Sequence, residues 1–324
     1  MQTLTLHDKL FSAIPQTGNA KEVGFFYRAK LKTSLIILLN AIEQRLQYNL
    51  ESLKYSLQEL QLDKKFSASL YHCYFKLLKA VREGNRELID AQLNMLSMLQ
   101  NNTIYCHAIK LENILTESWE KEVIQAQEAE TCDHNIKKIK FNPLSNAQLD
   151  HYANQAKDAL DIIQQEETVF FEEILEHVTA IKIHAGKVIV GVTSPKFYGA
   201  MYLSLPAKEE NALLFFIEHI VHETSHLHLN CLLAADALIL NAPTETYPAP
   251  IRASLRPMLG VYHATFVLSR MVRVFKQLEK SNFPGNDDGL AEKLALFISQ
   301  FNRGYQVLKA HAKATRLGAA IIDS

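Results

Sequence analysis

The sequence predicts a mainly α-helical protein with a small β-hairpin or short sheet immediately before a histidine-rich helix. Only 11 glycines and 9 prolines occur in 324 residues. Long tracts repeat apolar residues at spacings of three and four, which is the period of one helical face. Residues 180–205 break this pattern, because β-branched residues alternate there around a turn signal.

In chain order, residues 20–60 predict one long helix or two, and residues 67–84 and 85–100 predict two shorter helices. A further helix is expected to begin at Ser145, because serine commonly caps helix N-termini. Its apolar positions fall on one face, as expected of a helix that packs on a core: Leu149, Tyr152, Ala156, Leu160 and Ile163.

The polar segment 132–146 is either a linker or a loop within one domain. We therefore divide the chain into a helical region, 1–140, and a metal-binding catalytic region, 141–324. The first region would recognise a substrate or complete the core. The alternative is one continuous domain.

The β-rich stretch begins with alternating Ile181 and Ile183, followed by a turn signal at 185–186 and a β-branched run at 188–192. This pattern predicts a hairpin, with residues 201–205 as a third strand. The small sheet is thus expected to precede the histidine-rich segment directly.

The overall composition limits the classes of partner. The formal net charge is -1, with 48% hydrophobic and 21% charged residues, which gives no general electrostatic attraction to nucleic acid or to an anionic membrane. The first residues lack a signal-peptide pattern, and no apolar run approaches the roughly 18 residues of a spanning helix. We expect a cytoplasmic protein. The four cysteines occur singly, so neither a disulfide framework nor a thiolate zinc site is predicted.

The segment "FIEHIVHETSHLHLN" contains an HExxH motif, His222-Glu223-Thr224-Ser225-His226. Residues 211–240 contain no glycine or proline, so a helix is expected. Histidines four residues apart project from one helical face and can both reach one metal ion. Glu223 lies about 100° further round the helix. The alternative is a histidine-rich amphipathic helix whose imidazoles bond to one another or to the backbone.

A metal site would need a third ligand, and two candidates follow the motif. Glu245 follows His226 after 18 intervening residues, a spacing that resembles the gluzincin metallopeptidases. Those enzymes place the glutamate on a helix, whereas "NAPTETYPAP" contains too many prolines for one. His263 lies in an apolar segment that predicts a buried helix starting near Pro257.

Two arginines precede this second helix. Arg252 and Arg256 lie four residues apart in "YPAPIRASLRPM". A guanidinium near a metal commonly binds a carboxylate through two parallel hydrogen bonds. The alternative is that both arginines are solvated on the surface.

Residues 195–280 resemble the α-ketoglutarate-dependent HExxH-type peptide β-hydroxylases of ribosomal peptide natural-product biosynthesis. The resemblance lies in "IVHETSHLHLN", "YPAPIR" and "RPMLGVYH", in this order. It implies a non-haem Fe(II) held by His222, His226 and His263, with α-ketoglutarate (2-oxoglutarate) as co-substrate. It also implies a ribosomally made precursor peptide as substrate.

We therefore expect a 2-oxoglutarate-dependent dioxygenase that hydroxylates the β-carbon of a peptide side chain. Arg252 or Arg256 would bind the distal carboxylate of 2-oxoglutarate. Glu223 would orient a ligand histidine or contact the peptide. The alternative is an HExxH zinc metallopeptidase or other zinc hydrolase, with Glu223 as general base and either Glu245 or His263 as third ligand.

Overall fold

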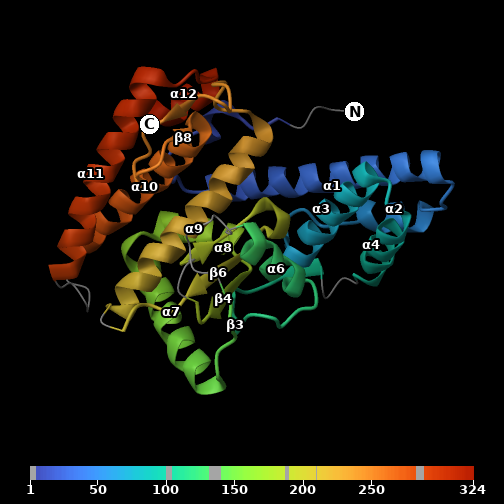
Figure 1. Cartoon of the computed structure of the whole chain (residues 1–324), viewed down its shortest axis with the longest axis horizontal. Coiled ribbons are helices and arrows are strands. Elements are labelled where there is room, and N and C mark those ends of the chain that lie inside the picture. Colours follow the sequence, from blue (N-terminus) through green and yellow to red (C-terminus); the bar gives the residue numbers. More distant parts are fainter. Residues whose placement is uncertain (1–4, 100–103, 131–139, 187–189, 209, 282–287) are drawn as a thin grey trace.

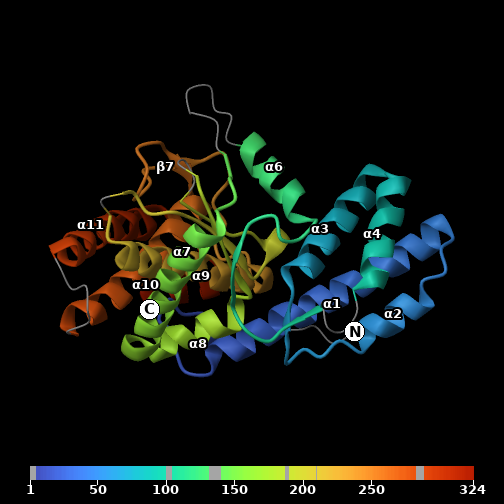
Figure 2. The same cartoon turned by 90° about the horizontal axis from the view of Figure 1, so that it is seen from below.

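The computed structural model describes residues 5–99, 104–130, 140–186, 190–208, 210–281 and 288–324. Helices make up most of this part of the chain, which confirms the predicted mainly α-helical class. The helices are α1 (Asn19–Leu46), α2 (Glu51–Gln58), α3 (Ala68–Glu83), α4 (Arg86–Met98), α6 (Glu120–Glu130), α7 (Asn146–Glu166), α8 (Thr168–His177), α9 (Ala212–Ala235), α10 (Met258–Lys280), α11 (Asp288–His311) and α12 (Arg316–Asp323). Figure 1 places α1–α4 at one end of the molecule and α10–α12 at the other, and Figure 2 agrees.

Helix boundaries follow local chemistry. The apolar tract at 20–60 forms two helices, because Gln47 has a φ of 59° and its N–H bonds to the carbonyl of Glu43, ending α1. At the start of α7, the Ser145 hydroxyl accepts the backbone N–H of Gln148, and the Gln148 side chain accepts the N–H of Ser145. This capping box confirms the predicted N-cap.

The strands are short: β1 (Lys65–Phe66), β2 (Tyr105–Cys106), β3 (Lys110–Asn113), β4 (Ala180–His184), β5 (Gly191–Val192), β6 (Ala200–Ser204), β7 (Thr246–Tyr247) and β8 (Arg256–Pro257). The main sheet has the order β3-β4-β6-β5. Strands β3, β4 and β6 are parallel, and β5 is antiparallel at one edge. Antiparallel β1–β2 and β7–β8 pairs complete the set.

The predicted hairpin is wrong in its pairing, although the short sheet before the histidine helix is present. β4 pairs in parallel with β6, which lies between β4 and β5. Every residue of β4 is buried, and a strand buried on both faces finds parallel partners through crossovers rather than through the next turn. Part of the predicted run, residues 188 and 189, lies outside the described residues.

The main sheet has a hydrophobic cluster on each face. Ile181, Ile183 and Leu203 belong to the large core, which also contains buried residues of α1, α7, α9 and α10. The opposite face, including Tyr202, joins a smaller cluster around Trp119 of the segment before α6. Alternate side chains of each strand thus enter different cores.

The two predicted regions share these contacts. β3 from region 1–140 pairs with β4 from region 141–324, and the large core runs from Leu10 to Ile321. Most of the candidate linker lies outside the described residues, but Asn142 forms a β-bridge with Ala185. Within the described ranges, no helix combines the length and apolar character that a membrane span requires.

Two packed helices carry the predicted metal ligands. α9 begins at Asn211, whose side chain caps Leu214 N–H, and its apolar positions are buried on several sides. α10 follows Pro257 and packs along both α9 and α11. Between them, β7 pairs with β8 so that Tyr247 lies opposite Arg256. This pairing closes residues 246–257 into a loop at the start of α10.

Candidate functional site

His222 and His226 lie on one face of α9, as their spacing predicts. Their Nε2 atoms are 3.2 Å apart and their ring centres 4.9 Å apart. Two nitrogens bound to one ion at about 2.1 Å lie roughly 3.0 to 3.4 Å apart. The pair therefore has the separation of two neighbouring ligands of a single ion.

His263 lies on α10 next to His226. The two ring centres are 5.8 Å apart, and the rings are inclined by 30°. Imidazoles that share an ion place their ring centres roughly 4.5 to 5.3 Å apart. Within the described ranges, no three His, Cys, Asp or Glu side chains are grouped so as to hold one metal ion. The structure thus brings the three histidines into one cluster, but the His263 ring lies too far from the His226 ring for both to bind one ion in this arrangement.

Burial keeps these imidazoles neutral at physiological pH. It lowers the pKa of both His222 and His263 to about 4. The pKa of His226 is lowered well below its usual range by burial, with further contributions from His222 and His263. Neutral imidazole is the form that binds metal ions, so proton competition at the cluster is weak.

Glu223 is buried between α9 and the sheet edge. Its Oε2 accepts a hydrogen bond of 2.7 Å from the Thr193 hydroxyl. A Cβ on Gly191 of β5 would lie 2.3 Å from Oε1, so any side chain at this position would displace the carboxylate. Burial raises the pKa of Glu223 to about 7. Glu223 thus follows His222 directly in the sequence, and its carboxylate lies against β5.

Glu245 is engaged elsewhere. Its Oε2 accepts a 2.8 Å hydrogen bond from the Tyr247 hydroxyl, and its Oε1 lies 3.5 Å from Lys313 Nζ. The segment that precedes β7 is not helical, as its prolines predict. These contacts tie Glu245 to the end of α11 and give no support to the gluzincin-like ligand set.

The two arginines differ in exposure. Arg252 is exposed, whereas Arg256, in β8, is half-buried. Neither guanidinium group forms a hydrogen bond or ion pair within the described part of the chain. A Cβ on Gly260 would lie 3.6 Å from the Cβ of Arg256. The Arg256 side chain therefore starts beside the first turn of α10, one turn before His263.

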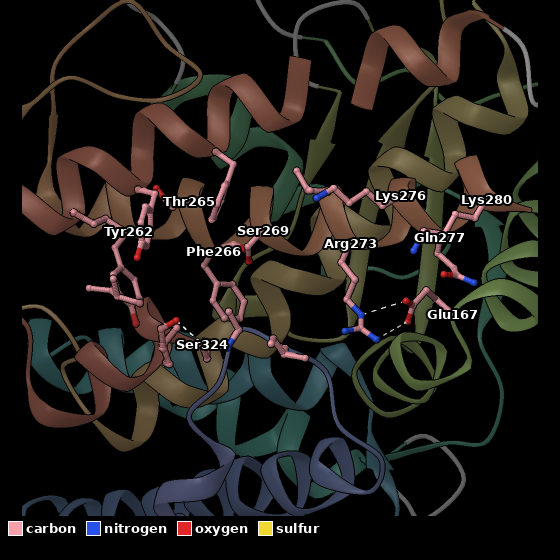
Figure 3. Close-up of a pocket in the computed structure, with 18 residues that line it drawn as sticks. Glu167, Tyr262, Thr265, Phe266, Ser269, Arg273, Lys276, Gln277, Lys280 and Ser324 are labelled. Carbon is pink, nitrogen blue, oxygen red and sulfur yellow. Dashed lines mark hydrogen bonds and ion pairs between the residues drawn. The ribbon is translucent and has the colours of Figure 1, made fainter. Parts of the chain in front are cut away.

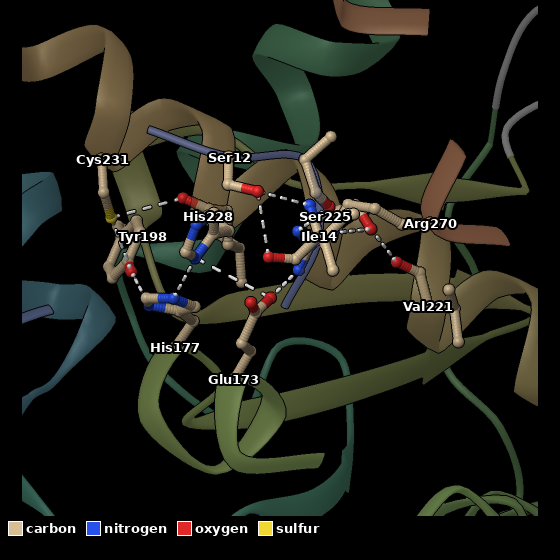
Figure 4. A network of polar contacts seen from close by, with 12 residues as sticks. Ser12, Ile14, Glu173, His177, Tyr198, Val221, Ser225, His228, Cys231 and Arg270 are labelled. Atoms are coloured by element: carbon tan, nitrogen blue, oxygen red, sulfur yellow. Dashed lines mark hydrogen bonds and ion pairs between the residues drawn. The ribbon is translucent and has the colours of Figure 1, made fainter. Parts of the chain in front are cut away.

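A buried polar network connects α8, α9 and α10 (Figure 4), and sequence reasoning missed it. Arg270 of α10 pairs with Glu173 of α8, and its Nε donates to the hydroxyl of Ser225 at 3.2 Å. Ser225 is the fourth residue of the HExxH motif, so Arg270 links the two helices that carry the histidines. The available signal was a charged residue at an apolar position of the "VLSRMVRVF" helix.

The network continues through two further histidines. His228 Nδ1 lies 3.0 Å from His177 Nε2, and His177 Nδ1 lies 2.6 Å from the Tyr198 hydroxyl, which also contacts Cys231. His228 thus faces away from the cluster. Its partners give it a structural position on the opposite side of α9.

No protein-family model matches this chain, and no curated protein is significantly similar to it.

Proposed function

We propose that this protein is an Fe(II)- and 2-oxoglutarate-dependent hydroxylase that acts on the β-carbon of a side chain in a ribosomally made peptide. The observation that carries the proposal is the pair of α9 imidazoles at ligand separation beside a third imidazole on α10. His222, His226 and His263 would hold the metal. The proposal requires the His263 ring to turn toward the other two.

The donor set suits a metal that needs open coordination positions. Three neutral imidazoles leave Fe(II) with its full double positive charge, which a dianionic 2-oxo acid balances. When bound, iron would supply the oxidising chemistry, with O2 and 2-oxoglutarate as co-substrates. The work of the protein is to fix the imidazoles and to keep them unprotonated.

Arg256 is the better candidate to bind the distal carboxylate of 2-oxoglutarate. Arg256 is half-buried and its Cβ lies near Gly260, about one turn before His263 on α10, whereas Arg252 is exposed. A partly desolvated guanidinium without an internal partner forms a stronger bond to a carboxylate than a solvated one does. Arg252 is then free to contact the peptide.

Glu223 would hold α9 against the edge of the sheet. Its hydrogen bond from Thr193 fixes the carboxylate beside His222, and a hydroxylase needs no general base for water. The second candidate is a zinc hydrolase that uses the same three histidines. The position of Glu223 next to His222 favours it, because a zincin uses this carboxylate on metal-bound water.

The test is the visible absorption band that forms when a 2-oxo acid chelates Fe(II) without oxygen. We expect the wild-type protein to develop this band with Fe(II) and 2-oxoglutarate. His263→Ala should abolish it, and Arg256→Gln should raise the 2-oxoglutarate concentration needed by about tenfold or more. His151→Ala, on the exposed side of α7, is the matched control and should behave as wild type.

Two outcomes would contradict the proposal. One is the absence of the band in a folded, Fe(II)-binding protein. The other is a His263→Ala variant that forms the band as the wild type does. If Arg252→Gln weakens the binding of 2-oxoglutarate and Arg256→Gln does not, the carboxylate contact belongs to Arg252.

A further inference from the structure

A groove runs along the face of α10 that turns toward α11 and α12 (Figure 3). It has a volume of about 470 Å³ and is also lined by the N-terminal segment at Ala13 and Ile14. None of the three clustered histidines lines it. Its lining positions on α10 extend from Tyr262 to Lys280, which is about 27 Å of helix at roughly 1.5 Å per residue.

One end of the groove is apolar. Phe266 of α10 faces Leu308 of α11 and Ile321 of α12 across it, and the rings of Phe301 and Tyr305 stack at 5.7 Å. This wall can bury an apolar chain, a contact that stabilises by about 0.8 kcal/mol for each CH2 group removed from water.

Two of the hydroxyls at this end are already engaged within α10. Thr265 donates to the carbonyl of Val261, and Ser269 donates to the carbonyl of Phe266, both within α10. An extended peptide would have to desolvate its backbone carbonyls here without these donors, which is costly. An alkyl chain has no such requirement.

The other end is cationic. Figure 3 shows Arg273, Lys276, Gln277 and Lys280 following one another along α10, with Glu167 opposite. Glu167 pairs with Arg273, with Oε1 3.2 Å from Nε. Lys276 and Lys280 form no ion pair with any residue that the structure describes. The lining of this end therefore contains three cationic side chains and one carboxylate.

We propose that the groove binds an amphipathic anion that has a single alkyl tail and a carboxylate head group. The tail would lie against Phe266 and the stacked aromatic rings, and the head group would meet Lys276 and Lys280. An α-helix with its side chains is about 10 to 12 Å across, so only one face of a helix could enter a groove of about 470 Å³, whereas a single alkyl chain can lie in it along its length. A slender chain with a charged end fits both the shape and the charge.

The first experiment measures binding by calorimetry with two probes of equal tail length, dodecanoate and dodecyltrimethylammonium, below their micelle concentrations. We expect saturable binding of dodecanoate, with the cation at least tenfold weaker. The double variant Lys276→Gln, Lys280→Gln should bind dodecanoate about tenfold or more weakly, because the charge-assisted contacts to its carboxylate are lost. The control with the same charge change is Lys121→Gln with Lys157→Gln, on α6 and α7, and it should bind as wild type.

A second variant tests the tail position. Ser269→Phe fills the middle of the groove and should abolish dodecanoate binding while thermal unfolding and circular dichroism show a folded protein. Equal binding of both probes would overturn the proposal, as would wild-type affinity in the lysine variant or in folded Ser269→Phe. Binding of an acidic helical peptide in the absence of dodecanoate binding would overturn it in favour of a peptide groove. The outcome is independent of metal binding at the histidine cluster.

Discussion

At the scale of single residues, burial decides the protonation state of nearly every histidine in the interior. His184 illustrates this away from the histidine cluster: it is 1% exposed at the end of β4, and its ring centre lies 4.5 Å from that of Phe141. Neither ring nitrogen has a hydrogen-bond partner among the described residues. Burial lowers the pKa of His184 to about 4 from a usual value of 6.5, so the folded protein holds this ring neutral.

This shift predicts acid destabilisation. As pH falls below 6.5, the unfolded chain binds a proton at His184 that the folded chain refuses until about pH 4. The contribution of His184 to the free energy of unfolding therefore falls across that window by about 1.4 kcal/mol per pH unit. Below the window this contribution changes no further. Urea unfolding between pH 4 and 8 measures how the free energy of unfolding depends on pH. In His184→Leu, this dependence should be smaller by the same amount per pH unit between pH 4 and 6.5. The exposed control His151→Leu should keep the wild-type slope, and an unchanged slope in His184→Leu would contradict the assignment.

At the scale of elements, the relative placement of α8, α9 and α10 depends on Arg270. Its guanidinium contacts Glu173, donates to Ser225 and stacks over Phe170 and Phe266 at 5.1 and 5.0 Å. The residue is 1% exposed. Removing one partner of a buried ion pair destabilises a protein far more than the intact pair stabilises it, because an uncompensated buried charge remains.

We therefore predict that Arg270→Met lowers the free energy of unfolding by about 3 to 5 kcal/mol. Arg270→Met combined with Glu173→Leu should recover most of the loss, because no uncompensated charge remains. Removing the exposed pair Lys309–Asp323 is the control and should leave stability unchanged within error. Urea denaturation measures all of these variants. A double variant as unstable as Arg270→Met would show that the pair does not act as a unit.

The elements also show where sequence reasoning succeeded. Local signals predicted α7 from Ser145 and α9 from a run without glycine or proline, and the four-residue spacing placed His222 and His226 together. The parallel pairs of β4 could not be predicted, because β3 is distant in the chain and β6 follows β5, so no turn joins β4 to either partner. For the same reason, the contact between Arg270 and Ser225 depends on how two helices pack, which their separate sequences do not state.

At the scale of the whole molecule, the histidine cluster lies where α9 and α10 pack together. α9 also packs against α1, α7 and α8. The N-terminal helices therefore support the helix that carries the HExxH motif, whatever else they bind. The groove on the far face of α10 is built from the C-terminal helices, so α10 takes part in both proposed binding sites.

The most direct test of the central claim is succinate formation from 2-oxoglutarate under air, with Fe(II), in the wild type, Glu223→Gln and His226→Ala. Glutamine can still accept the hydrogen bond from Thr193, and an oxygenase has no step in which Glu223 takes a proton from water. We predict that Glu223→Gln retains measurable succinate formation and that His226→Ala loses both iron and turnover. A hydrolase would instead lose about two to four orders of magnitude in rate with Glu223→Gln. Peptide backbone cleavage that requires Glu223, and that continues without oxygen or 2-oxoglutarate, would contradict the account.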